Sequence, residues 1–336
     1  MSKVVLHIGT HKTATTTIQD VFARNAKLLA EHGLIYPKLG RAAGHHGLVM
    51  DWSVYLPKIY GLPGGSLASL RRIAADHAAG SHTVFLSSEE FSRGTDTLQV
   101  DFSAVREALS GFDDIEVVCV LREQWQFVQS IYLEVSKIRV PPRPPLFVET
   151  VLKDDLIEGL WTDYNLLYDL LLKSFPPEAI TFLDFDDCRA SEGGILGRML
   201  AYLGVDLAPA ALELVNEGRS NASPLPLPAF AANLVAEPKV APAWLVEATT
   251  GAFQVQFGQK ARSQLWTREE YRVLRDYAQD RNGRLSDRLL PYQPGFAVHA
   301  TNQREGDIYR EDLRADFWVR SNRWLFGATQ RKGGPG

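Results

Sequence analysis

The sequence predicts an α/β protein in which a parallel sheet is flanked by helices on both faces. Short apolar runs at residues 4–8, 83–88, 116–122 and 179–185 indicate four buried strands. Segments of helical composition separate these runs, and such alternation is typical of a parallel sheet covered on both faces. At 336 residues, 45% hydrophobic and 23% charged, the chain is long enough for one large domain or two small ones.

The elements follow in order. After the first strand and a loop, a helix is predicted to end at Gly33, and residues 51–65, rich in aromatics, proline and glycine, indicate a surface segment. Further helices are expected at 66–79, 102–109, 123–137, 161–174 and 193–203, the last of them capped by Gly204.

The carboxy-terminal part is less regular in its pattern. The prolines of residues 141–145 predict an extended connection, and the Leu/Pro-rich stretch 223–242 shows no clear periodicity. Thr267 and Glu270 form a capping box for a helix through about Leu290. A last helix is expected at about 310–326, and residues 333–336 should be disordered.

Charge and cysteine content exclude several classes of function. A net charge of −4 and a pI near 6.1 provide no global basic field, so we expect no nucleic-acid partner. Two cysteines make neither a disulfide framework nor a metal cluster. The start of the sequence lacks the zones of a signal peptide, and no apolar run approaches the ~20 residues of a membrane span. We therefore expect a soluble, cytoplasmic protein.

The loop between the first strand and the first helix has the composition of an anion site. Gly9 allows a tight turn, and Lys12 supplies a positive charge. The hydroxyls of Thr13, Thr15 and Thr16 stand at a helix start, where the first N–H groups have no partner and a phosphate or sulfonate would satisfy them. The plainer alternative is a helix with an ordinary threonine cap.

A nucleotide kinase or NTPase is the second alternative. Its phosphate loop requires G-x-x-x-x-G-K-[ST], with the lysine at the end of the motif. Here Lys12 comes three residues after Gly9, and no second Gly-Lys pair follows. The spacing therefore disfavours a triphosphate site.

Two segments resemble the sulfotransferases that use 3′-phosphoadenosine 5′-phosphosulfate (PAPS). Residues 12–16, Lys-Thr-Ala-Thr-Thr, are similar to the Lys-Thr-Gly-Thr-Thr of the 5′-phosphosulfate loop in the carbohydrate-modifying branch, with Ala14 in place of the usual glycine. Arg122 at the end of the third predicted strand, with Ser130 eight residues later, resembles the family's site for the 3′-phosphate. The resemblance covers roughly residues 3–205.

The resemblance implies a P-loop-like fold, PAPS as co-substrate without a metal, and sulfuryl transfer to a hydroxyl or amine of a small-molecule or glycan acceptor. The first loop favours a carbohydrate. Arg219 lies where members of the family make further contacts with PAPS. The cofactor-binding candidates are Thr10, His11, Lys12, Thr13, Ala14, Thr15, Thr16, Arg122, Ser130 and Arg219. A domain of residues 1–290, with its PAPS-binding core at about 3–205 and a helical region at about 206–290, would precede an extension of residues 291–336.

The catalytic candidates are Lys12, Glu89 and His46. Lys12 would meet the charge that develops on the departing oxygen, and a general base must take the acceptor's proton. Glu89, preferred to its neighbour Glu90, follows the second predicted strand, whereas His46 lies beside His45 in the Gly-rich loop before that strand. The sequence leaves open which is the base. It also leaves open a binding protein without catalysis, and whether the last third shapes an acceptor cleft or a homodimer contact.

Overall fold

The computed structural model describes residues 1–95, 97–215, 224–301 and 305–332. The chain forms two compact units. The first comprises Met1–Arg122, Leu156–Asn221 and Asp280–His299, and the second comprises Glu123–Asp155, Ala222–Gln279 and Ala300–Gly336. The domain boundary predicted at residue 290 falls inside the last segment of the first unit.

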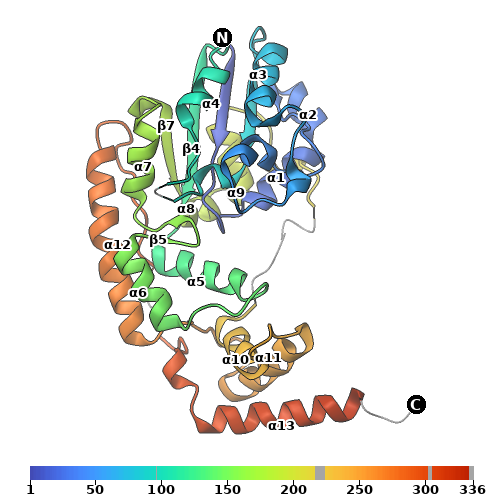
Figure 1. Cartoon of the computed structure of the whole chain (residues 1–336), viewed down its shortest axis with the longest axis vertical. Coiled ribbons are helices and arrows are strands. Elements are labelled where there is room, and N and C mark those ends of the chain that lie inside the picture. Colours follow the sequence, from blue (N-terminus) through green and yellow to red (C-terminus); the bar gives the residue numbers. More distant parts are fainter. Residues whose placement is uncertain (96, 216–223, 302–304, 333–336) are drawn as a thin grey trace. The chain divides into compact units, whose positions relative to one another are not determined.

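A five-stranded sheet forms the centre of the first unit (Figure 1). Its order is β2-β3-β1-β4-β7, and every neighbouring pair is parallel. Its strands are β1 (Lys3–His7), β2 (Leu34–Ile35), β3 (Thr83–Ser87), β4 (Asp114–Leu121) and β7 (Ile180–Asp184), and β5 (Leu156–Ile157) pairs antiparallel with β6 (Leu160–Trp161). The predicted α/β class with a parallel sheet is confirmed, and so are the four predicted strands. The edge strand β2 has only two residues, too few to show a pattern.

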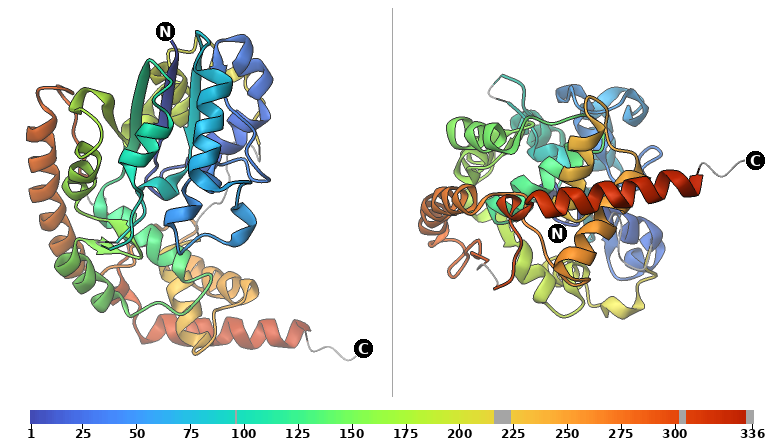
Figure 2. Two further views of the ribbon diagram at one scale, coloured as in Figure 1. Left: turned by 45° about the horizontal axis from the view of Figure 1, so that its top comes forward. Right: turned by 90° about the horizontal axis from the view of Figure 1, so that it is seen from below.

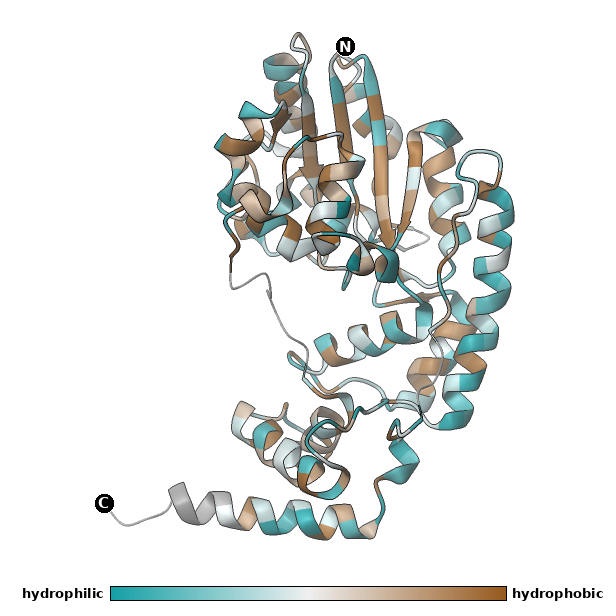
Figure 3. Cartoon of the chain, turned by 180° about the vertical axis from the view of Figure 1, so that it is seen from behind, coloured by the Kyte–Doolittle hydropathy of each residue, from teal (hydrophilic) through white to brown (hydrophobic). Residues whose placement is uncertain are grey.

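Alternating side chains along the strands belong to two hydrophobic cores, one on each face of the sheet. Val4 and Leu6 belong to one core and Val5 to the other, and all three are fully buried. The first core takes residues from α3 (Gly65–His77), α4 (Phe102–Ala108) and α7 (Tyr164–Leu172), and the second from α1 (Thr15–Arg24), α2 (Ala26–Glu31), α8 (Phe185–Ala190) and α9 (Gly194–Tyr202). Figure 2 shows helices on both sides of the sheet, and Figure 3 shows that its strands are largely hydrophobic.

The first predicted helix is divided in two at Asn25. The backbone N–H and side-chain amide of Asn25 both donate to the carbonyl of Val21, at 3.0 and 2.7 Å, and its Oδ1 accepts the backbone N–H of Glu213 at 2.9 Å. Asn25 is the C-cap of α1 and the residue before α2, and its side chain competes for the helical carbonyl of Val21. The surface segment before α3 contains two short 3₁₀ helices, η1 (His46–Trp52) and η2 (Lys58–Tyr60).

The second unit is mainly helical. It contains α5 (Gln124–Val135), α6 (Pro144–Asp154), α10 (Pro226–Ala236), α11 (Ala243–Phe257) and α13 (Ala315–Lys332), and α12 (Arg268–Leu289) contributes residues to both units. A small core of Leu227, Ala231, Phe253 and Phe317 joins α10, α11 and α13. The capping box is confirmed, because Thr267 and Glu270 exchange backbone-to-side-chain hydrogen bonds of 2.9 and 3.1 Å.

Two predictions for this unit are wrong, and proline is the reason for both. Pro144 lies in the predicted extended connection, but it begins α6, and Pro226 begins α10 where no regular element was expected. Proline is favoured in the first turn of a helix, where its missing N–H has no intrahelical partner to lose. The last helix begins at Ala315 instead of 310, after the short η7 (Arg310–Asp312). Residues 333–336 lie outside the described residues.

Candidate active site at the carboxyl edge of the sheet

Parallel pairing brings the predicted site segments to one edge of the sheet. His7 at the end of β1 pairs with Ser87 at the end of β3, and Leu121 at the end of β4 pairs with Asp184 at the end of β7. The loop after β1, the glutamate pair after β3 and Arg122 after β4 therefore share one edge. In open α/β sheets this carboxyl edge is where ligands bind.

The loop after β1 is anchored to β4 by its first residues. The Thr10 N–H and hydroxyl donate to the carbonyl of Val120 at 2.8 and 3.2 Å, and the Val120 N–H donates to the carbonyl of Gly9. Further along, Lys12 and Ala14 both have φ of 62°, in the left-handed region. Ala14 is the N-cap of α1, and a methyl group cannot satisfy the first N–H groups of that helix. The helix start therefore retains the character of an anion site.

Two of the loop threonines bond to the loop itself. The hydroxyls of Thr13 and Thr15 donate to the carbonyl of Thr10, at 2.6 and 3.3 Å, and both side chains are buried. Their protons are thus used inside the loop, where they fix its turn. Thr16 is half-buried on the first turn of α1.

Arg122 reaches the same loop from β4. Its Nη1 donates to the carbonyl of Lys12 at 3.2 Å, although 110 residues separate the two. The guanidinium also lies over the ring of Phe185, at 5.2 Å from the ring centroid. Ser130 is buried on α5, in the second unit. Arg219 lies outside the described residues.

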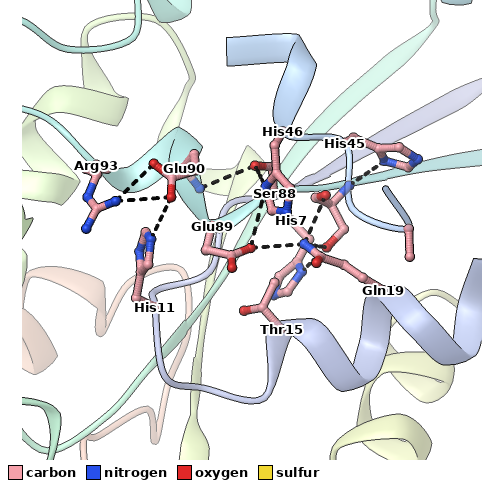
Figure 4. A network of polar contacts seen from close by, with 12 residues as sticks. His7, His11, Thr15, Gln19, His45, His46, Ser88, Glu89, Glu90 and Arg93 are labelled. Atoms are coloured by element: carbon pink, nitrogen blue, oxygen red, sulfur yellow. Dashed lines mark hydrogen bonds and ion pairs between the residues drawn. The ribbon is translucent and has the colours of Figure 1, made fainter. Parts of the chain in front are cut away.

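The two glutamates after β3 have separate partners (Figure 4). Glu90 is buried between His11, at 3.0 Å, and Arg93, at 3.2 Å. Burial would raise the pKa of Glu90, but the hydrogen bond and charge of His11, together with Arg93, lower it to about 2. A carboxylate held ionised in this way is a poor acceptor for a substrate proton. We interpret Glu90 as the group that fixes His11 in the loop.

Glu89 faces the other way and lies directly against the loop. A Cβ on Gly9 would be only 2.8 Å from the Cβ of Glu89 and 2.9 Å from its Cα. The half-buried Glu89 carboxylate accepts a hydrogen bond from Gln19 at 3.0 Å, and its Oε2 is 3.9 Å from Nδ1 of His46. Glu89 and His46, the two sequence candidates for the base, thus lie together.

His45 is a structural residue. Its Nδ1 accepts the backbone N–H of Ser87 at 2.9 Å, so Nε2 carries the proton that it donates to the carbonyl of Pro37 at 2.7 Å. Burial lowers the pKa of His45 to about 4. His46, in contrast, is partly exposed. Its Nδ1 lies 2.9 Å from the Ser88 hydroxyl. Its ring packs edge-on against that of Tyr60, with 5.3 Å between the ring centroids.

Two residues beneath the site were not selected from the sequence. His7 is fully buried, with Nδ1 2.8 Å from the Ser87 hydroxyl, and burial lowers its pKa to about 4. Gln19 is buried on the face of α1 that also carries Ile18 and Phe22. A polar amide within that apolar stripe was the signal that could have identified it.

The acidic end of β7 could offer ligands to a metal. Asp184, Asp187 and His299 each have a ligand atom within 4.8 Å of the others. Hydrogen bonds account for this arrangement, because Asp184 accepts the backbone N–H groups of Asp187 and His299, at 2.9 and 3.2 Å. His299 Nε2 lies 3.0 Å from Asp187. We therefore assign these residues a structural role in joining α8 to the segment after α12.

Among the described residues, no helix is long and apolar enough to cross a membrane. Cys119 and Cys188 are free and buried.

No family model and no curated protein sequence matches the chain. Among solved structures, a sulfotransferase from Alicyclobacillus acidocaldarius is 12% identical, with a TM-score of 0.41 over 64% of this chain and 87% of that one. Mouse sulfotransferase SULT7A1 complexed with PAP is 15% identical, with a TM-score of 0.35 over 62% and 61%. A sulfotransferase domain from the curacin biosynthetic pathway is 11% identical, with a TM-score of 0.35 over 62% and 76%.

Proposed function

We propose that this chain is a sulfotransferase that moves the sulfuryl group of PAPS to a hydroxyl or amine of a carbohydrate or glycoconjugate acceptor. The observation that supports it most strongly is the contact between Arg122 and the backbone of Lys12, at 3.2 Å. PAPS carries anionic groups on the 3′ and 5′ positions of one ribose, so a site for it needs two cationic regions close together. The loop with the α1 start suits the phosphosulfate, and Arg122 suits the 3′-phosphate.

The transfer would proceed in line. A bond forms from the acceptor oxygen or nitrogen to sulfur while the bond from sulfur to the bridging oxygen breaks, and the electron pair of that bond remains on the departing phosphate. Lys12 would stabilise this developing charge together with the first N–H groups of α1. One preorganised donor of this kind contributes roughly 3–4 kcal/mol to the transition state.

Glu89 would accept the proton of the acceptor. It lies against the same loop, at the close approach to Gly9, whereas Glu90 is held by His11 and Arg93. His46 is 3.9 Å from the Glu89 carboxylate and serves either as its partner or, in the alternative assignment, as the base itself. A positioned base contributes roughly 10²- to 10⁴-fold to the rate.

Tyr60 beside His46 and Tyr55 beside Arg93 support an acceptor that contains sugar rings. Tyr60 lies edge-on to His46, and Tyr55 is 41% exposed, with Arg93 over its ring at 4.5 Å. Partly exposed tyrosines offer a flat apolar face with a polar tip, which suits stacking on sugars. The carbohydrate-type loop sequence favours the same class of acceptor.

The test is a transfer assay with labelled PAPS and pools of glycan and small-molecule acceptors. We expect label transfer by the wild type and a loss of more than about tenfold in Lys12→Ala, with measurable nucleotide binding, because a transition-state donor is removed. Lys27→Ala, an exposed lysine of α2, is the matched control and should retain full activity.

Other outcomes would overturn the proposal. Binding of the desulfonated nucleotide without transfer to any acceptor would favour a non-catalytic binding protein, for which the unusual Ala14 is the supporting feature. Magnesium-dependent ATP hydrolysis would favour a kinase or NTPase. Turnover of Lys12→Ala above about a tenth of the wild-type rate would reject the role given to Lys12.

A further inference from the structure

The side chain of Gln19 connects α1 to the end of β3 (Figure 4). Its amide nitrogen donates to Glu89 Oε2 at 3.0 Å, and the Ser87 carbonyl and hydroxyl lie at 3.2 and 3.4 Å. The residue is only 3% exposed, although it lies on the helix that begins at the anion loop. A buried amide with this set of acceptors has little freedom to turn.

The opposite side of the amide is also confined. A Cβ on Gly44 would lie 2.5 Å from Gln19 Oε1 and 2.7 Å from His46 Nε2. The backbone at Gly44 therefore packs directly on the Gln19 amide, and the segment that carries His46 holds Gln19 against Glu89. The hydrogen bond to Glu89 is thus set by packing on both sides.

We propose that Gln19 is a positioning residue that holds the Glu89 carboxylate in the orientation in which it serves as proton acceptor. The inference rests on the proposed function, in which Glu89 is the base. A hydrogen bond donated to a carboxylate is charge-assisted and favours its ionised form. Gln19 is one helical turn after Thr15, so the helix that binds the phosphosulfate at its start also sets the position of the base.

The role can be tested without catalysis by measuring the titration of the Glu89 carboxyl with carbon-13 NMR, assigned through Glu89→Gln. Gln19→Leu removes the donor at similar volume, so the Glu89 carboxyl should titrate at higher pH than in the wild type. Gln19→Glu places a second carboxylate at the same point, so the higher pKa of the coupled pair should rise further. Other titratable groups that face Glu89 are His46, His7 and Tyr36, and neither variant replaces any of them.

Activity provides the second readout. In Gln19→Leu, kcat should fall about 10- to 100-fold, with the KM for PAPS nearly unchanged, and the acidic limb of the pH profile should move to higher pH. Asn165→Leu is the matched control, because Asn165 is also a buried amide of the first unit, bonded to Asp163 and Arg281. It should lower stability without shifting the pH profile.

An unchanged Glu89 titration in both Gln19 variants would overturn the inference. Equal losses of kcat in Gln19→Leu and Asn165→Leu, with no shift of the pH profile, would do the same. If the wild type neither binds nor uses PAPS, the proposed function fails, and the NMR titration still decides whether Gln19 controls the ionisation of Glu89.

Discussion

At the scale of single residues, Ala14 is the least expected feature of the site. Ala14 stands where the 5′-phosphosulfate loop that residues 12–16 resemble has a glycine. Its φ of 62° nevertheless lies in the left-handed region, which glycine adopts most easily. For a residue with a Cβ this conformation costs roughly 1–2 kcal/mol. This strained residue is the N-cap of α1 and lies next to the candidate anion site.

Ala14→Gly should therefore stabilise the protein by about 0.5–1 kcal/mol, because the relief of the left-handed strain exceeds the added entropy of the unfolded chain. Ala75→Gly, in an exposed right-handed position of α3, is the same substitution and should destabilise by about 0.5–1 kcal/mol. Urea unfolding of both variants measures the difference. If the two variants lose equal stability, the backbone at Ala14 is not left-handed.

The sequence identified the residues of the loop but not the direction of their side chains. Lys12, Arg122 and Glu89 all follow strands that the apolar pattern predicted, whereas the strand order that brings them to one edge is seen only in the structure. Thr13 and Thr15 turn their hydroxyls onto the carbonyl of Thr10, and no pattern in the sequence distinguishes that arrangement from one facing an anion.

At the scale of elements, the close approach between the anion loop and the end of β3 defines the site. Gly9 has φ of 91°, and its missing side chain is what allows Glu89 to lie against the loop. A Cβ at Gly9 would contact the backbone of Glu89 as well as its side chain, so a change of the Glu89 rotamer could not relieve the clash.

Gly9→Ala should therefore lower the free energy of unfolding by about 2–4 kcal/mol, the sum of backbone strain and overpacking. Gly33→Ala is the control, because Gly33 also has a positive φ of 78°, while nothing lies within 4 Å of its added Cβ. It should cost only the backbone strain, about 1–2 kcal/mol. Equal losses in chemical denaturation would show that Glu89 does not press on the loop.

Elements with a clear apolar pattern could be predicted from the sequence. Helix starts and ends that depend on one residue could not. The four main strands and the capping box at Thr267 are where the sequence indicated. The helix break at Asn25 depends on a side-chain hydrogen bond. The helix starts at Pro144 and Pro226 depend on proline in a first turn. Hydrophobic periodicity alone indicates neither.

At the scale of the whole molecule, two buried histidines beneath the site link stability to pH. Burial lowers the pKa of His7 and of His45 from an ordinary 6.5 to about 4. The folded protein therefore binds fewer protons than the unfolded chain between these values. Their contribution to stability is complete above pH 6.5 and is lost as the pH falls toward 4.

The free energy of unfolding should thus fall on acidification from pH 6.5, by about 1.4 kcal/mol per pH unit for each histidine. His45→Gln removes one titrating group and should reduce that slope by about 1.4 kcal/mol per unit, besides lowering stability at neutral pH. His32→Gln, at an exposed position, should leave the slope unchanged. Urea unfolding measured at several pH values between 4.5 and 7.5 makes the comparison, because the two pKa values of each histidine are about 4 in the folded protein and 6.5 in the unfolded chain. An unaltered slope in His45→Gln would mean that His45 is not buried in its neutral form.

The most direct test of the account is calorimetric titration with adenosine 3′,5′-bisphosphate and with adenosine 5′-monophosphate, which differ only in the 3′-phosphate. The wild type should bind the bisphosphate more tightly, and Arg122→Ala should lose about 10- to 100-fold of that affinity, with little change for the monophosphate, because one charge-assisted contact is removed. Equal affinity of the wild type for both nucleotides, or no uptake of either, would contradict the claim that the anion loop and Arg122 hold the two ends of one donor.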